Sequence, residues 1–167
     1  QAWRCLNEPN YLSSRILKAA YYPNSSIFEA ELGSNSSQIW RATVDGRDIM
    51  KQCAIMRIGD GKSTCIWQHN WIPRANMVRP NSSLVQDPPQ VVVDLIDPSL
   101  TSWREDLIRK VFVPVDAEAI LRIPLCTKQV HDFWAWSENP RGSFSVRTSY
   151  NMICRIKNGR EAWLEEE

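Results

Sequence analysis

Apolar residues recur at helical spacing in several short stretches of the chain, each bounded by residues that start or stop helices. The stretch 12–22 ends at Pro23, which cannot continue a helix. A second helix is predicted from Ser36 or Ser37, either of which can cap it, to about Met50. Three further short helices are predicted, two of them at residues 102–113 and 116–123. The last is expected to run from Thr148 or Ser149 to Ile156 and to stop at Asn158 and Gly159.

Two pairs of strand-like stretches predict β-hairpins. Residues 54–58 and 63–67 flank a loop whose Gly and Asp residues tolerate the positive φ that tight hairpins require. Alternation along the second stretch places Trp67 beside Cys65, on the face that we expect to be buried. Residues 133–136 and 143–146 predict a second hairpin.

The order of these elements predicts an α+β fold, with short helices and two β-hairpins mixed with long loops. Residues 74–90 are rich in Pro, Asn and Ser and are typical of a linker. Residues 91–96 form an apolar run that fits either a strand or the start of a buried helix.

Composition narrows the class of protein. Eight tryptophans supply material for a core. The formal net charge of +1 argues against a protein whose whole surface attracts nucleic acid, although local basic patches remain open. The chain has no apolar run of the ~20 residues that a membrane span needs, so we expect no membrane partner. Its five cysteines include no C-x-x-C pair and are expected to be reduced thiols.

Catalytic and cofactor motifs are missing from the sequence. No Asp-Asp pair and no paired carboxylates in an apolar strand are present, as a two-metal polymerase site would require. Residues 59–61 resemble the start of a phosphate-binding loop, but a phosphate cradle needs a helix N-terminus next, and the following residues are strand-like. The hairpin turn is therefore the favoured interpretation of these residues. We expect no enzyme activity, no cofactor and no small-molecule substrate.

A metal site is also disfavoured. Cys65 with His69 and Cys126 with His131 are the two pairs of potential ligands. Zinc needs four ligands, so both pairs would have to meet across a long proline-rich stretch. Buried thiols and surface histidines are the favoured interpretation, and no metal is expected.

Several blocks resemble the proteins of plant LINE-type non-LTR retroelements. Residues 57–63 (RIGDGKS), 66–67 (IW) and 71–73 (WIP) resemble the family's R-I-G-D-G-x-S…W-x-x-x-W-[LI]-P block. Met56 and His69 depart from it, standing where a Trp and an Asp are usual. Further blocks in the family's order are 17–26 (LKAAYYPNSS), 40–41 with 46–48 (WR…GRD), 93–97 (VDLID), 119–125 (AILRIPL), and 133–136 (FWAW) with Gly142 and 144–150 (FSVRTSY). The last set is similar to D-x-[LF]-x-W…G-x-[FY]-[ST]-V-[KR]-[ST]-[AG]-Y.

The resemblance covers nearly the whole chain and implies a place between a reverse-transcriptase core and a zinc-binding-like domain. It implies four segments: a post-polymerase helical segment plus hairpin (1–73), a linker (74–90), a helical connector (91–129) and the start of the zinc-binding-like domain (130–167). The rest of the parent polyprotein, which would be an RNA-directed DNA polymerase, is then a partner.

A non-catalytic connector of this kind would assist the binding of RNA or DNA. Arg41, Arg57 and Lys62 are the candidate phosphate contacts, while Trp67 and Trp71 are candidates for stacking on bases. The competing interpretation, which we favour, places both tryptophans in the core and the basic residues on a solvated rim. The alternative function is a degenerate retroelement remnant without activity, motivated by the start at Gln1 instead of Met and by the truncated last domain.

Overall fold

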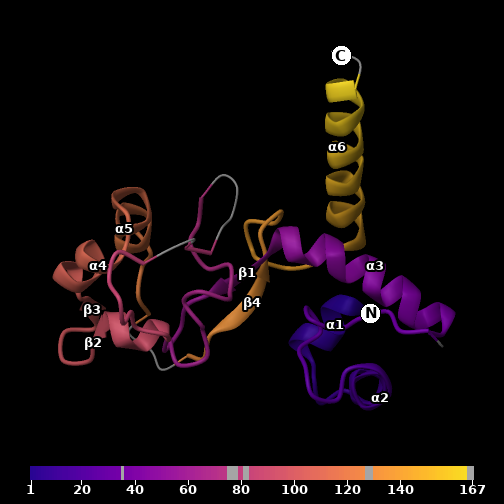
Figure 1. The fold of residues 1–167 in the computed structure, drawn as a ribbon, viewed down its shortest axis with the longest axis horizontal. Helices are drawn as coiled ribbons and strands as arrows, with labels where there is room; N and C mark the ends of the chain where they lie inside the picture. The colour runs from indigo at the N-terminus through magenta and orange to yellow at the C-terminus, as the bar shows by residue number, and fades with distance from the viewer. Residues whose placement is uncertain (35, 75–78, 81–82, 127–129, 165–167) are drawn as a thin grey trace. The chain divides into compact units, whose positions relative to one another are not determined.

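The protein has an α+β fold, seen in a computed structural model that describes residues 1–34, 36–74, 79–80, 83–126 and 130–164 (Figure 1). The predicted fold class is therefore confirmed. The chain divides into two units: unit 1 comprises Gln1–Ala54 and Trp136–Glu167, and unit 2 comprises Ile55–Ala135. This division differs from the four predicted segments, whose boundaries within a parent protein stay a prediction. Among the described residues, no helix is both long and apolar enough to cross a membrane.

Unit 1 is helical. Its short first helix packs against the next two (Figure 1). The second and third helices confirm the predicted stretches, whereas the six-residue first helix was not predicted. The last helix runs through Gly159, so the predicted stop there is wrong; a helix interior tolerates Gly at a cost of about 1 kcal/mol. The helices are α1 (Ala2–Asn7), α2 (Leu12–Tyr21), α3 (Gln38–Cys53) and α6 (Val146–Leu164).

The start of α3 is fixed by Ser37. Its hydroxyl accepts the Trp40 backbone N–H at 3.2 Å and the Tyr21 hydroxyl at 2.9 Å. Trp40 is fully buried, and its ring stacks on those of Tyr21 and Tyr22 with centroids 4.6 and 5.5 Å apart. Ser37, which caps the helix, is therefore hydrogen-bonded to two residues of the aromatic cluster of unit 1, Tyr21 and Trp40.

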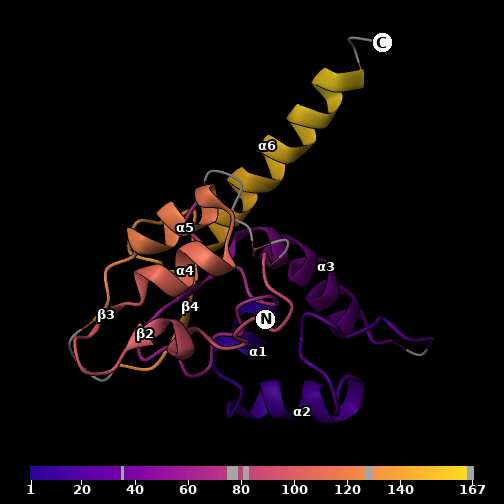
Figure 2. The ribbon, with the colours of Figure 1, turned by 60° about the vertical axis from the view of Figure 1, so that its left-hand side comes forward.

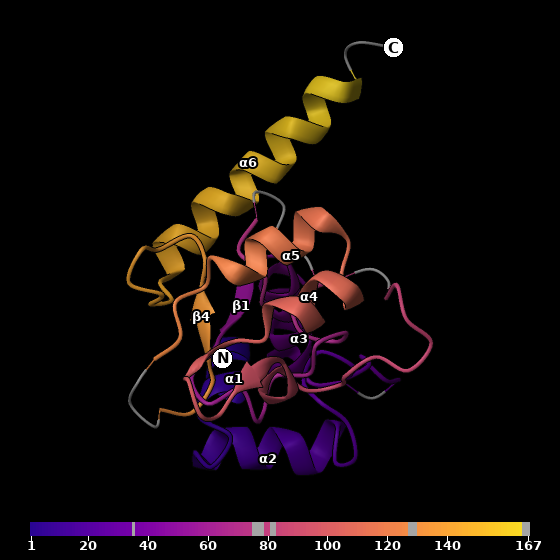
Figure 3. The same cartoon turned by 90° about the vertical axis from the view of Figure 1, so that its left-hand side faces the viewer.

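The strands β1 (Ala54–Arg57) and β4 (Phe133–Trp136) pair with each other in a two-stranded sheet (Figure 3). Both predicted hairpins are therefore wrong. The Met56 N–H donates to the Asn70 carbonyl at 2.7 Å, and residues 63–67 form no strand beside β1. Strand-like stretches of sequence identified the two strands, but not their partners, because pairing across more than about 70 residues leaves no local pattern.

The stretch 64–66 pairs instead with residues 90–92, through backbone hydrogen bonds of 2.9 and 3.0 Å and an antiparallel bridge between Cys65 and Val91. The predicted linker thus contributes to unit 2 at its C-terminal end. Leu84, which also belongs to the predicted linker, donates its N–H to the Val111 carbonyl at 2.9 Å.

The two faces of the 64–67 stretch are reversed relative to the expectation. Thr64 and Ile66 are fully buried, whereas Cys65 and Trp67 are only half-buried. The predicted alternation itself is correct. The choice of face was wrong because the unit 2 core, and not the size of the side chains in this stretch, decides which face turns inward.

The remainder of unit 2 consists of short elements. The ambiguous run 91–96 is mostly a 3-10 turn, followed by a short strand in a hairpin, in which Ile96 pairs with Trp103 and Asp97 with Ser102. The helix predicted from Ser102 begins only at Glu105, because Ser102 and Trp103 belong to this hairpin. Figure 2 shows the two helices of this unit side by side. The elements are η1 (Val92–Leu95), β2 (Ile96–Asp97), β3 (Ser102–Trp103), α4 (Glu105–Val111) and α5 (Pro114–Leu121).

The hydroxyl of Ser37 provides a first test. Ser37→Ala removes the acceptor for the Trp40 N–H and should lower the free energy of unfolding by about 1 kcal/mol. Ser36→Ala is the matched control, since the Ser36 hydroxyl accepts a hydrogen bond from the exposed Arg41 side chain and its loss should change stability little. Urea denaturation followed by circular dichroism measures both. Equal effects of the two substitutions would show that Ser37 is not the cap.

Candidate nucleic-acid interface

The loop formed by residues 59–64, hereafter the 59–64 loop, surrounds the carboxylate of Asp132. The backbone N–H groups of Gly59 and Gly61 donate to Oδ1 at 2.7 and 2.9 Å. Oδ2 accepts the Ser63 N–H at 3.1 Å, the Ser63 hydroxyl at 3.2 Å and the Thr64 hydroxyl at 2.7 Å. Five donors thus converge on two oxygens, an arrangement of backbone amides that forms an anion-binding concavity without a helix.

This hydrogen bonding controls the charge of Asp132. Burial favours the neutral acid, but the hydrogen bonds from Thr64, Gly59, Gly61 and Ser63 together outweigh it and hold the pKa of Asp132 below its ordinary value. The carboxylate is therefore ionised at neutral pH, and each of its oxygens is satisfied by the loop. The interaction joins residues about 70 positions apart and fixes the chain just before β4.

Both glycines of the 59–64 loop are required by close backbone approach. A Cβ at Gly59 would lie 2.1 Å from the Val130 carbonyl oxygen, and one at Gly61 would lie 2.8 Å from the Val93 nitrogen. Gly61 also has φ +71°, a conformation that side chains disfavour. The prediction that these residues adopt turn geometry is correct in kind, but the turn serves to bind a carboxylate and does not join two strands.

Asp60 organises the outer side of the loop. One of its oxygens accepts the Lys62 N–H at 3.2 Å, and the other lies 3.2 Å from Nδ1 of His131. His131 is almost fully exposed, whereas the Asp60 side chain is largely covered. The loop therefore contacts both Asp132 and the residue that precedes it.

The basic candidates lie in different parts of the chain. Lys62 belongs to the 59–64 loop and is exposed, and Arg57 is exposed at the end of β1, two residues before the loop. Arg41 belongs to α3 of unit 1, where its guanidinium donates to Ser36 at 3.0 Å. Only Arg57 and Lys62 are thus brought together within one unit.

The tryptophan candidates are core residues to different degrees. Trp71 is 1% exposed and donates its indole N–H to the Ile66 carbonyl at 3.0 Å, which leaves no ring face for a base. Trp67 is half-buried, with its ring on Phe112 at 5.4 Å and its N–H donated to the Pro89 carbonyl at 2.8 Å. The core interpretation therefore describes Trp71 well and Trp67 in part.

Asp132, Ser63 and Thr64 were not among the predicted site residues. Asp132 lies four residues before Trp136, which matches the first position of the D-x-[LF]-x-W block. The spacing within each block was visible in the sequence, but nothing local showed that one block binds the other.

The Cys and His pairs form no metal centre in the part of the chain that the structure describes, where no group of three or more potential ligands occurs. His69 accepts the Cys65 backbone N–H through Nδ1 at 3.1 Å and packs edge-on against Trp134. Burial lowers the pKa of His69, more than the nearby Asp132 raises it, so the ring is neutral at pH 7. The one strongly buried carboxylate among the described residues, Asp116, lies 2.6 Å from the Arg74 guanidinium.

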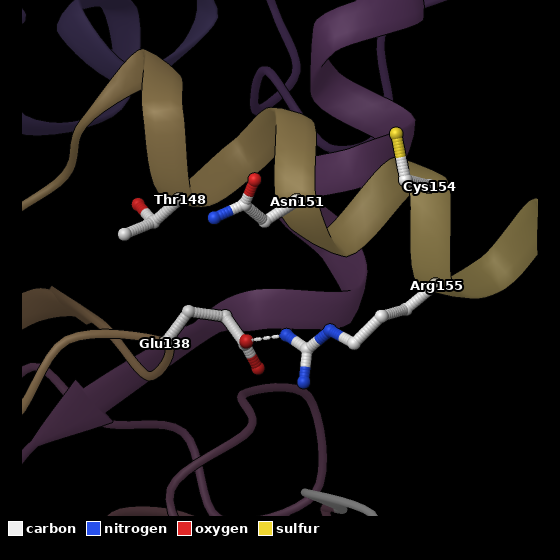
Figure 4. A pocket seen from close by; sticks show the side chains of 5 residues that line it. All are labelled: Glu138, Thr148, Asn151, Cys154 and Arg155. Carbon is white, nitrogen blue, oxygen red and sulfur yellow. Dashed lines mark hydrogen bonds and ion pairs between the residues drawn. The ribbon is translucent and has the colours of Figure 1, made fainter.

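Unit 1 carries a separate open pocket of about 450 Å³ beside α6. Arg155 donates to Glu138 across it (Figure 4), so the guanidinium is neutralised by a carboxylate of the same pocket. Its remaining lining residues are Thr148, Asn151 and Cys154. This charge pairing gives the pocket no preference for an anion or a cation.

Comparison with known proteins gives one distant relation. The chain is 36% identical over 72 residues to an uncharacterized mitochondrial protein of Arabidopsis thaliana. The match covers 43% of this chain and 47% of that protein, so it spans about half the length of the relative. No family model matches the chain. No solved structure matches it either.

The Asp132 carboxylate gives the second prediction. Asp132→Asn replaces one acceptor oxygen by a donor and leaves loop N–H groups unpaired, so the free energy of unfolding should fall by roughly 1–3 kcal/mol at pH 7. Because the folded-state pKa is depressed, this stabilisation is present above the unfolded value of about 3.9 and is lost as pH falls through the folded pKa. The difference between wild type and variant in urea denaturation should shrink below about pH 4. A difference that stays constant down to about pH 2 would contradict this role.

Gly59 gives the third prediction. Gly59→Ala forces a methyl group onto the Val130 carbonyl and should destabilise the protein by about 3 kcal/mol or more, because backbone must move. Gly46→Ala is the matched control. Gly46 lies within α3, and a Cβ there would meet only the Ala2 side chain, at 3.6 Å, so this substitution should raise the free energy of unfolding by up to about 1 kcal/mol. Thermal unfolding of the two variants compares them. A Gly59→Ala protein as stable as wild type would disprove the close approach.

Proposed function

We propose that this chain is a non-catalytic connector of a retroelement reverse-transcriptase protein that helps to hold RNA or DNA beside the polymerase. The proposal rests first on the ordered sequence blocks that resemble LINE-type elements. The distant relation to a plant mitochondrial protein is compatible with it but adds no function.

The Asp132 interaction is the observation that carries the proposal. It joins the 57–63 block to the block that begins at Asp132, so two separate parts of the resemblance are the two halves of one contact. The donors of the 59–64 loop lose their acceptor without Asp132, and the Asp132 carboxylate loses its donors without the loop. A remnant drifting without constraint would easily lack one of the two glycines, the hydroxyl donors or the carboxylate, and this chain has all of them.

The two departures from the family pattern are also accommodated. Met56 is 6% exposed within the unit 2 core, and its backbone N–H is paired with Asn70. His69 accepts the Cys65 N–H, a role that the usual aspartate could fill as well. These contacts favour a retained fold over the alternative of a degenerate remnant.

Local basic side chains must supply the affinity, because unit 2 has as many acidic as basic residues. Lys62 is exposed in the 59–64 loop, and Arg57 is exposed two residues before it, where both can meet neighbouring phosphates. We therefore infer weak, salt-dependent binding through this edge of unit 2, without base stacking by Trp71.

Binding of a structured RNA over a salt series tests the function. Arg57→Ala and Lys62→Ala should each weaken binding several-fold and reduce the slope of log K against log salt by about 0.7–0.9, the loss of one phosphate contact. Fluorescence anisotropy over roughly 50–200 mM salt, where the affinity of such contacts falls steeply, is the measurement.

Lys110→Ala is the matched control. Lys110 is an exposed lysine of the same unit, but it shares its surroundings with Glu105 and Asp106, which disfavour a phosphate. Weak binding with a flat salt dependence, unchanged in the Arg57 and Lys62 variants, would favour the remnant. Magnesium-dependent nuclease or polymerase activity of the purified chain would overturn the non-catalytic assignment.

A further inference from the structure

The donors of the 59–64 loop define a receptor for an anion with two oxygens. Two N–H groups serve one oxygen of Asp132, and one N–H with two hydroxyls serves the other. None of these donors is specific for a carboxylate. A phosphodiester also presents two adjacent oxygens that share one negative charge, and hydroxyls and backbone amides bind it in the same way.

The charges around the receptor favour a monoanion. The Asp60 carboxylate is part of the loop and lies on its outer side, where it would repel a dianion. Lys62 is the neighbouring cation on the loop, and His131 faces Asp60 at 3.2 Å. A phosphodiester and a carboxylate carry the single charge that this balance accepts, whereas a terminal phosphate carries more.

The receptor is also reachable from solvent on one side. Lys62 and Ser63 are exposed, and the hydrogen bonds of Ser63 to Oδ2 lie at the surface. Gly61 and Thr64 are buried and form the inner side of the loop. An anion entering from the Ser63 side would meet the same donors, provided that Asp132 did not already occupy them.

We propose that the 59–64 loop is a phosphodiester-binding site that the chain fills with its own Asp132 carboxylate. The inference rests on the proposed function for the identity of the ligand. Asp132 is attached to the same chain, so its effective concentration at the loop is high, and it excludes a dissolved anion from the wild-type protein. Removal of the carboxylate opens the site.

Dimethyl phosphate is the probe, because it is the smallest phosphodiester monoanion, and neutral trimethyl phosphate is its matched control. Asp132→Ala and Asp132→Ser both remove the carboxylate that fills the loop. In each variant, dimethyl phosphate at about 100 mM should raise the melting temperature by roughly 5 °C over sodium chloride of equal ionic strength, because it binds the folded state only. Trimethyl phosphate should have no such effect, and formate should act like dimethyl phosphate.

Two further proteins separate site binding from a general effect of the salt. Wild type, in which Asp132 fills the loop, should show less than about 1 °C of shift, since a blocked site contributes no binding term. Gly61→Ala is destabilised by its positive φ and by contact with Val93 but keeps Asp132, so it should show no specific rescue either.

The outcomes decide between the possibilities. Rescue of an Asp132 variant by dimethyl phosphate, including recovery of a folded state from an unfolded one, supports the proposal. Equal shifts in Gly61→Ala, rescue by formate alone, or failure of both Asp132 variants to respond to any anion overturns it. Because the readout contains no RNA, a positive result together with flat RNA binding by wild type would refute the proposed function while leaving the site intact.

Discussion

The carboxylate of Asp132 in the 59–64 loop is the contact on which the organisation of unit 2 depends. It satisfies three backbone N–H groups and two hydroxyls, of which those of Gly61 and Thr64 belong to buried residues. It also fixes the chain immediately before β4, so that this strand meets β1. The two glycines make this possible, because a side chain at either would occupy the space of the approaching backbone. One ionised group therefore contacts the 59–64 loop directly beside the strand that pairs with β1.

The same contact changes how the Gly-rich block is understood. A sequence with two glycines, an aspartate and a lysine suggests either a tight turn or the start of a phosphate loop. The loop has features of both, since Gly61 adopts the positive φ of a turn while the amides around it converge on an anion. No helix follows the loop directly, and its anion is supplied by the chain itself. A Gly-rich anion site can thus be a structural element whose ligand is internal.

Burial separates the candidate nucleic-acid residues into two groups, the tryptophans of the core and the exposed basic residues. Trp71 and Trp67 are candidates for stacking because of their rings, yet the indole N–H of each is donated to a backbone carbonyl of unit 2. Arg57 and Lys62 stay exposed near the loop, whereas Arg41 lies in unit 1. What remains exposed is a small basic edge formed by Arg57 and Lys62, beside an anion site that Asp132 occupies.

Local patterns were sufficient to predict the α+β class, the positions of α2, α3 and α5, a serine cap for α3 and the turn geometry of the 59–64 loop, since these follow from spacing, capping and backbone freedom. The strand partners, the buried face of residues 64–67 and the role of Asp132 emerged only in the folded chain. Each of these depends on residues brought together from distant parts of the chain. A hydrogen bond between residues about 70 positions apart leaves no periodicity, because its two ends are selected by the fold and not by their neighbours in sequence.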